Sequence, residues 1–122
     1  VLEYHHELKE TDIVEGVQLL LSAALQEDNK TLRETFLRTI STAVSYHDIG
    51  NSIDWNKLVD ALPSLGNLEL PYALNILGFS GQAKYLPVLE EYTQHADSEV
   101  REWADDAIDN ITSRQRASDS PG

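Results

Sequence analysis

The sequence contains no cysteine, which excludes disulfides and thiolate metal sites. Lysine and arginine are scarce as well: 9 of them stand against 21 aspartates and glutamates, for a formal net charge of -12. Nucleic-acid phosphates and anionic membrane surfaces both attract clustered basic side chains, so we expect neither as a partner. A basic protein partner is compatible with this charge, although an acidic surface also serves solubility alone.

Long apolar runs are missing too. The longest, residues 17–25, is interrupted by Gln18 and Ser22, and a helix that spans a membrane needs about 20 apolar residues in a row. Methionine is absent even at position 1, so we expect a processed or trimmed chain. The length of 122 residues suits one domain, and we expect a cytoplasmic protein.

Apolar residues recur at three- and four-residue steps along most of the chain, whereas no stretch alternates as a strand does. The sequence therefore predicts an all-α fold of about six helices in three hairpins. The expected helices cover residues 12–28, 31–47, 55–62, 71–78, 83–95 and 98–111. Residues 1–10 are expected to form a loose N-terminal arm and residues 113–122 a disordered, small and polar C-terminal tail. A single domain, residues 11–112, lies between them.

Local signals mark several helix starts. Asp12 with Glu15, and Thr31 with Glu34, match the capping box in which two side chains satisfy free backbone N–H groups. Pro71 fits the first turn of the fourth helix, where its missing N–H costs little. These signals support the predicted helix boundaries.

The stretch Gly78-Phe79-Ser80-Gly81 raises the question of a nucleophilic serine. A nucleophile elbow needs Gly-x-Ser-x-Gly between a strand and a helix, but the next residue is Gln82 and a helix precedes the stretch. The glycines fit better as a helix stop and a tight turn. The histidines also lack metal-binding spacing; they are His5, His6, His47 and His95. We therefore expect no catalytic residue, no metal and no cofactor.

Pairs of alanine and an aliphatic residue recur late in the second helix of each predicted hairpin. They are Ala43-Val44, Ala73-Leu74 and Ala107-Ile108, at spacings of 30 and 34 residues. The C-terminal half is more specific and reads Ala73-Leu74-x-x-Leu77-Gly78-x-x-Gly81, then Leu86-Pro87-x-Leu89, then Asp97-x-x-Val100-Arg101-x-x-Ala104-x-x-Ala107-Ile108-x-x-Ile111. This pattern resembles a HEAT-type helical repeat, especially the short variety found in bilin lyases, and the resemblance is best over residues 70–111.

The resemblance implies a right-handed stack of antiparallel helix pairs. The expected fold is therefore a short, right-handed, HEAT-like α-solenoid of three helix hairpins. The resemblance also implies structural roles for two charged residues: Asp97 would cap a helix, and Arg101 would brace a neighbouring turn. In such solenoids the second helices line a concave surface that commonly binds partners.

Outward-facing side chains of two second helices would share that concave surface. The predicted partner-binding residues are Tyr72, Asn75, Phe79, Glu99, Glu102, Trp103, Asp105, Asp106 and Asp109. Aromatic anchors surrounded by carboxylates suit a basic protein partner. The acids also fit a second interpretation, in which they form a solvated helix face and the aromatic residues pack within the chain.

The function expected from these features is non-catalytic protein binding by a monomer or weak dimer. A concrete version is a small bacterial immunity or antitoxin protein that covers a basic toxin domain, because charge speeds the encounter with a cationic site. One alternative is a bilin-lyase-like enzyme, although no residue set that would carry the reaction is visible. Another is a structural subunit of a larger complex.

Overall fold

A computed structural model describes residues 10–119, so the predicted arm, residues 1–10, lies almost entirely outside the described residues. Between residues 10 and 119 the chain forms six α-helices and no strand, which confirms the all-α fold class. The helices are α1 (Glu10–Gln26), α2 (Lys30–Tyr46), α3 (Asn56–Ala61), α4 (Leu70–Ser80), α5 (Leu86–Tyr92) and α6 (Ser98–Asp119). Three short 3₁₀ turns join them: η2 (Gly50–Ser52), η3 (Leu62–Ser64) and η4 (Ala83–Tyr85).

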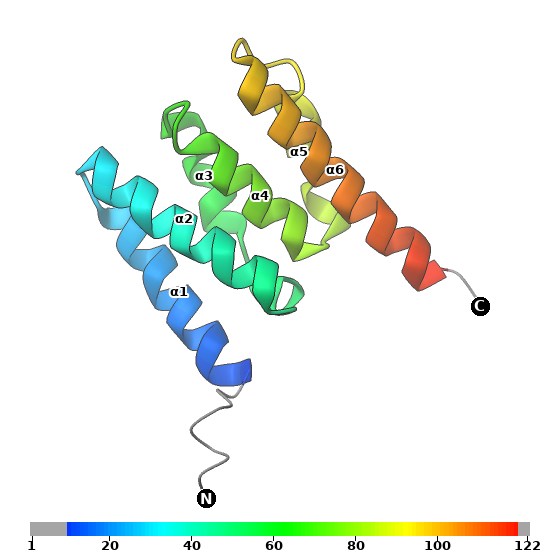
Figure 1. The fold of residues 1–122 in the computed structure, drawn as a ribbon, viewed down its shortest axis with the longest axis horizontal. Helices are drawn as coiled ribbons and strands as arrows, with labels where there is room; N and C mark the ends of the chain where they lie inside the picture. Colours follow the sequence, from blue (N-terminus) through cyan, green and yellow to red (C-terminus); the bar gives the residue numbers. More distant parts are fainter. Residues whose placement is uncertain (1–9, 120–122) are drawn as a thin grey trace, which may run out of the picture.

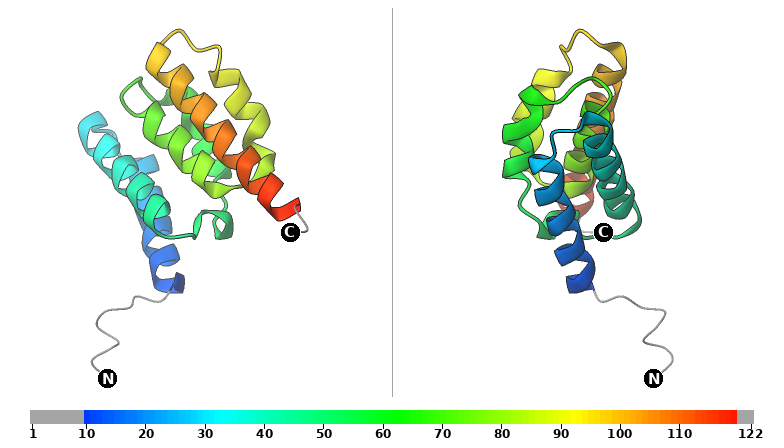
Figure 2. Two further views of the ribbon diagram at one scale, coloured as in Figure 1. Left: turned by 45° about the vertical axis from the view of Figure 1, so that its right-hand side comes forward. Right: turned by 90° about the vertical axis from the view of Figure 1, so that its left-hand side faces the viewer.

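The helices are arranged in two layers. α2, α4 and α6 lie side by side and run in the same direction, with α4 in contact with both neighbours (Figure 1). α1, α3 and α5 form the layer behind them (Figure 2). The α1–α2 hairpin therefore stands at one end of the molecule and the α5–α6 hairpin at the other. No helix between residues 10 and 119 combines the length and apolar character needed to cross a membrane.

The ends of α2 and α4 show which local signals act. Asn29, not Thr31, caps α2: its Oδ1 accepts a hydrogen bond from the backbone N–H of Leu32 at 3.0 Å, so the predicted cap is wrong. α4 begins with Pro71 in its first turn and ends at Gly81, as predicted. Gly81 has φ +66°, a left-handed conformation that suits glycine because it has no Cβ. Gly81 is thus confirmed as the helix stop, whereas Gly78 lies inside α4, which continues to Ser80 and so extends past the predicted end at residue 78.

The fifth helix is shorter than predicted. Residues 83–95 were expected to form one helix, but η4 precedes α5, and α5 ends at Tyr92. Pro87 lies in the first turn of α5. Because proline has no N–H, a helix that started before it could not make the regular hydrogen bond at this position. The chain therefore restarts its helix at Leu86.

The start of α6 matches the roles implied for Asp97 and Arg101. The Asp97 Oδ1 accepts hydrogen bonds from the backbone N–H groups of Glu99 and Val100, at 2.9 and 3.2 Å. The Arg101 Nη1 donates to the carbonyl oxygens of residues 95 and 96, at 2.8 and 3.1 Å. Asp97 thus caps α6, and Arg101 braces the turn between α5 and α6.

α6 also continues well past residue 112, where the disordered tail was predicted to begin. Residues 113–119 are helical, which corrects the prediction for that stretch. The Gln115 Nε2 donates to the carbonyl oxygen of Gly81 at 3.0 Å, and Arg114 lies over the ring of Phe79. Arginine, glutamine and alanine are good helix formers, and these two contacts attach the extended helix to the end of α4.

The core has a polar contact at its centre, the carbonyl oxygen of Gly50. Trp55, fully buried, donates from Nε1 to this oxygen at 2.9 Å. The Gln82 Nε2 donates to it at 3.2 Å and the Ile53 N–H at 3.4 Å. A Cβ added at Gly50 would lie 2.4 Å from the carbonyl oxygen of Phe79, so this turn packs directly on the backbone of α4.

Replacing Trp55 by phenylalanine should lower the free energy of unfolding by about 1.5 kcal/mol, measured by urea denaturation. The smaller ring leaves part of a fully buried site unfilled and removes the Nε1 hydrogen bond to Gly50. Trp103→Phe is the matched control, since Trp103 is only half-buried. Equal losses in the two variants would contradict the central role of Trp55.

Candidate protein-binding face

One flank of α6 faces α4. The guanidinium carbon of Arg114 lies 5.6 Å from the ring centroid of Phe79, which places the Arg114 side of α6 next to α4. At about 100° per residue, Trp103 and Asn110 share this side, because they lie eleven and four residues before Arg114. Glu99 and Asp106 precede them by four residues each and border the same flank.

α4 contributes three side chains to this surface. Tyr72, Asn75 and Phe79 are half-buried, whereas the rest of α4 is buried. The Asn75 Nδ2 donates to the Oγ of Ser41 on α2 at 2.6 Å, so part of its hydrogen-bonding capacity is used within the fold. We call the combined surface the α4–α6 face. It consists of Tyr72, Asn75, Phe79, Glu99, Trp103 and Asp106.

Three predicted binding residues lie elsewhere on α6. Glu102, Asp105 and Asp109 are exposed, but the helical spacing turns them away from the flank that faces α4. Asp105 lies closest to the side of Arg101, which contacts the turn before α6. The structure therefore brings six of the nine predicted residues to one face and leaves three on the outer side of the helix.

Among the side chains that the structure describes, the carboxylates of α6 have no basic partner. In the described part of the chain, ion pairs join Arg33 to Glu69 and Arg114 to Asp48, the second at 3.4 Å. No carboxylate of α6 takes part in either pair. The α4–α6 face is consequently negative near the start of α6, whereas Arg114 adds a positive charge beside Phe79, near the end of α4.

Arg114 is the surface residue that the sequence analysis missed. It was assigned to the disordered tail, yet it lies over Phe79, and its Nε donates to the Oδ1 of Asn110 at 3.1 Å. The four-residue step from Asn110 to Arg114 is a spacing at which helical side chains meet. That spacing and the good helix formers at residues 114–117 are the signals in the sequence that favour a longer α6.

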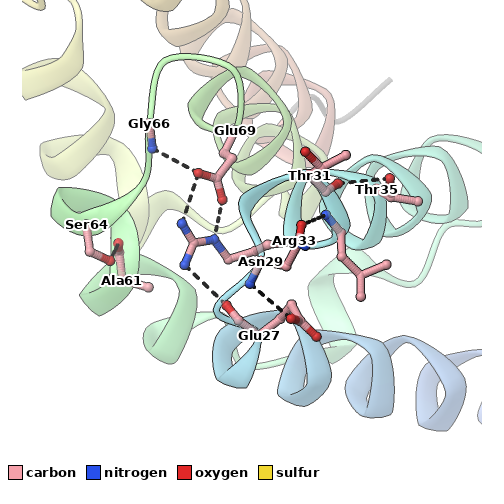
Figure 3. Close-up of polar contacts among 10 residues, drawn as sticks. Glu27, Asn29, Thr31, Arg33, Thr35, Ala61, Ser64, Gly66 and Glu69 are labelled. Atoms are coloured by element: carbon pink, nitrogen blue, oxygen red, sulfur yellow. Dashed lines mark hydrogen bonds and ion pairs between the residues drawn. The ribbon is translucent and has the colours of Figure 1, made fainter.

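A buried ion pair fixes the other end of α2 and α4. Figure 3 shows the Arg33 guanidinium between the carboxylate of Glu69 and the carbonyl oxygen of Glu27. The Arg33 Nη2 donates to the Glu69 Oε1 at 3.1 Å, and the backbone N–H of Gly66 donates to the same oxygen at 3.1 Å. One carboxylate thus joins α2 to the loop that leads into α4.

The pKa values of this pair reflect the contact. Burial disfavours the charged carboxylate of Glu69, but the hydrogen bonds from Arg33 and Gly66, together with the charge of Arg33, outweigh it and lower its pKa. The hydrogen bond to Glu69 raises the pKa of Arg33, against the opposing effect of burial. Both groups are therefore charged at neutral pH, and their role here is to hold helices together.

Side chains that often perform chemistry make local contacts in this structure. Ser80 is fully buried and its hydroxyl donates to the carbonyl oxygen of Leu77 at 2.5 Å, within the same helix. The Nδ1 of His95 accepts a hydrogen bond from the N–H of Asp97 at 3.0 Å. Among the described side chains, no three His, Asp or Glu residues gather as a metal site would require. His5 and His6 lie outside the described residues.

Comparison with known proteins adds no relative from which a site could be transferred. The α4–α6 face is the described surface on which the predicted residues converge, and its chemistry is the basis for a functional proposal. No family model, no curated protein and no solved structure matches this chain.

Proposed function

We propose that this chain is a non-catalytic protein-binding module built as a short, right-handed, HEAT-like α-solenoid. The parallel row of α2, α4 and α6 over a second layer of helices supports this proposal (Figure 1). The local roles of Asp97 and Arg101 support it too, since they match those that the resemblance implies. In such a solenoid the row of second helices is the binding surface.

The observation that carries the binding role is the composition of the α4–α6 face. Tyr72, Phe79 and Trp103 are half-buried, so they are held by the core but keep surface for a partner. Beside them, Glu99 and Asp106 are exposed, and neither is in an ion pair with another described residue. Aromatic anchors with uncompensated charge at their edge favour a basic protein partner over an apolar one.

The partner that suits this surface is the cationic domain of a toxin, with the chain acting as a small bacterial immunity or antitoxin protein. A net charge of -12 on 122 residues accelerates encounter with a positively charged surface. An inhibitor gains from such steering because it must bind before the toxin acts. The aromatic side chains then provide the short-range contacts.

Two adjacent aspartates allow a sharp test. Asp106→Lys places a positive charge on the α4–α6 face, whereas Asp105→Lys makes the same change on the outer side of α6. The basic partner is first recovered from cell extract on the immobilised wild-type chain. We expect Asp106→Lys to weaken its binding about tenfold and Asp105→Lys to change its binding less than about threefold. Affinity is measured by titration with the purified partner at low and at high ionic strength.

Both variants carry the same net charge, so a difference between their affinities for the partner must arise from the position of the lysine on α6. Equal weakening by the two substitutions would show a general charge effect and count against the α4–α6 face. Binding that does not respond to salt would contradict a charge-steered contact. Thermal denaturation of both variants establishes that they remain folded.

A further inference from the structure

The α1–α2 hairpin has an open apolar groove, lined by residues of this hairpin and by no other helix between residues 10 and 119. All the residues that line it come from α1, from α2 and from His47 directly after α2. Its floor and walls are formed by Ile13, Gly16, Val17, Leu20, Ala43 and Tyr46. Tyr46 is 80% exposed, and Leu19, on the same hairpin, is 73% exposed. The groove is small, so apolar exposure alone does not identify a partner, and the features that indicate one are Gly16 and the charges at its ends.

Two threonines on α2 add to the apolar character of the groove. The Thr39 hydroxyl donates to the carbonyl oxygen of Thr35 at 2.9 Å, and the Thr42 hydroxyl donates to that of Arg38 at 3.0 Å. Threonine hydroxyls bonded to their own helix in this way are already satisfied. What these side chains still offer to a partner is mainly the methyl group.

Gly16 has no role that the described chain explains. It lies within α1, where glycine weakens a helix, and a Cβ added there would meet no atom within 4 Å. Gly78 on α4 is different, because its missing side chain lets Ala107 of α6 approach closely. At Gly16 the backbone of α1 is bare in the same way, but it faces solvent. A bare helix surface of this kind would allow another helix to pack closely against it.

Charges at the two ends of the groove indicate what that other helix is. Asp12 lies at the end near Tyr46, and Arg38 lies toward the other end, near Leu20. Gly16 lies between them, because α1 and α2 run in opposite directions (Figure 1). A two-fold axis that lies in the contact plane near Gly16 and is inclined from α1 toward α2 would bring Asp12 of each copy toward Arg38 of the other. The groove is therefore complementary in charge to itself.

We infer that a second copy of this chain binds in the α1–α2 groove and forms a symmetric dimer in which two α1 helices cross at Gly16. A two-fold contact requires a surface that complements itself, and the Asp12 and Arg38 positions satisfy that requirement. The acidic helix α6 lies at the opposite end of the molecule, so the two negative surfaces stay apart (Figure 1). The inference does not depend on the proposed toxin-binding role, which uses another face.

Sedimentation velocity of the full chain over a wide concentration range, at physiological ionic strength, tests this dimer. The wild type should shift from monomer to dimer as concentration rises. Gly16→Lys should raise the dissociation constant at least about tenfold, because a long charged side chain would enter the contact. This variant should fold as well as the wild type, since lysine favours helix and the added atoms have space.

A charge exchange tests the two-fold arrangement itself. Asp12→Arg and Arg38→Asp should each weaken the dimer about tenfold by placing like charges opposite each other, and the double variant should recover most of the loss. Lys57→Asp, which makes the Arg38→Asp charge change at an exposed site on α3, should have little effect. A wild type that is monomeric at every concentration, a dimer unaffected by Gly16→Lys, or a double variant as weak as the single ones would each overturn the inference.

Discussion

Replacing Glu69 by glutamine is expected to lower the free energy of unfolding by about 3 to 4 kcal/mol. The substitution keeps the shape of the side chain but removes the charge that Arg33 needs. The Arg33 side chain is only 16% exposed, so water replaces the lost carboxylate only in part. Removing one member of a buried pair is costly because the other charge remains buried alone.

A double variant distinguishes the net stabilisation that the ion pair provides from the destabilisation caused by removing only one of its partners. Arg33→Met combined with Glu69→Leu should be more stable than Glu69→Gln, because no unpaired charge is left. Urea denaturation gives both free energies, and Glu90→Gln, at an exposed site, is the control for loss of a carboxylate. A double variant that is the least stable of all would mean that the charged contact itself stabilises the fold.

The same ion pair makes the free energy of unfolding depend on pH in the acidic range. The pKa of Glu69 is lowered in the folded chain, so its contribution is fully present above the ordinary glutamate pKa of about 4.3. It is lost as the pH falls through the lower pKa of the folded state, because the unfolded chain then binds one more proton. Glu69→Gln should therefore lose less stability than the wild type on acidification below about pH 4.3. If the free energies of unfolding of the wild type and of Glu69→Gln fell in parallel with pH, this prediction would be contradicted.

Gly78→Ala should lower the free energy of unfolding by about 2 to 3 kcal/mol. A Cβ at this position would lie 2.8 Å from the Cα and 2.9 Å from the Cβ of Ala107. Both atoms are held by the backbone of α6, so no flexible side chain can move aside. α4 and α6 would have to separate, which would open the packing between their buried faces.

The matched control is the same substitution at Gly16. There the added methyl group has free space, and replacing glycine by alanine within a helix should stabilise the fold by about 1 kcal/mol. The two substitutions should therefore change the free energy of unfolding in opposite directions. Both variants are measured at protein concentrations low enough to keep the chain monomeric. A stabilised Gly78→Ala protein would contradict the close contact between α4 and α6.

The parts of the fold that could be predicted are those with local causes. The left-handed turn at Gly81 follows from glycine chemistry, and helical periodicity identified all six helices. Asn29 and Thr31 are both good caps and lie two residues apart, so the sequence alone does not show which of them caps α2. Local pattern is sufficient to find a helix but decides its ends less well.

Features that depend on distant residues could not be read in this way. The partners Arg33 and Glu69 are 36 residues apart, and residues 113–119 gain contacts with α4 that no local pattern shows. For the candidate face, the acidic side chains are exposed, as the spacing predicted, whereas Tyr72, Phe79 and Trp103 are half-buried against the core. The spacing alone could not show which side of α6 lies against α4. That side decides that Asp106 borders the α4–α6 face and that Asp105 does not.

The three donors that meet at the Gly50 carbonyl oxygen have a consequence for the way the molecule opens. They come from the turn after α2, from the start of α3 and from the segment after α4. All three bonds lie between the end of α2 and the start of α5, so they connect the turn before α3, the start of α3 and the segment after α4 to one another. Amide hydrogens of the turn before α3 and of α3 should therefore exchange with solvent through one shared opening event, in which the segment after α4 separates from Gly50.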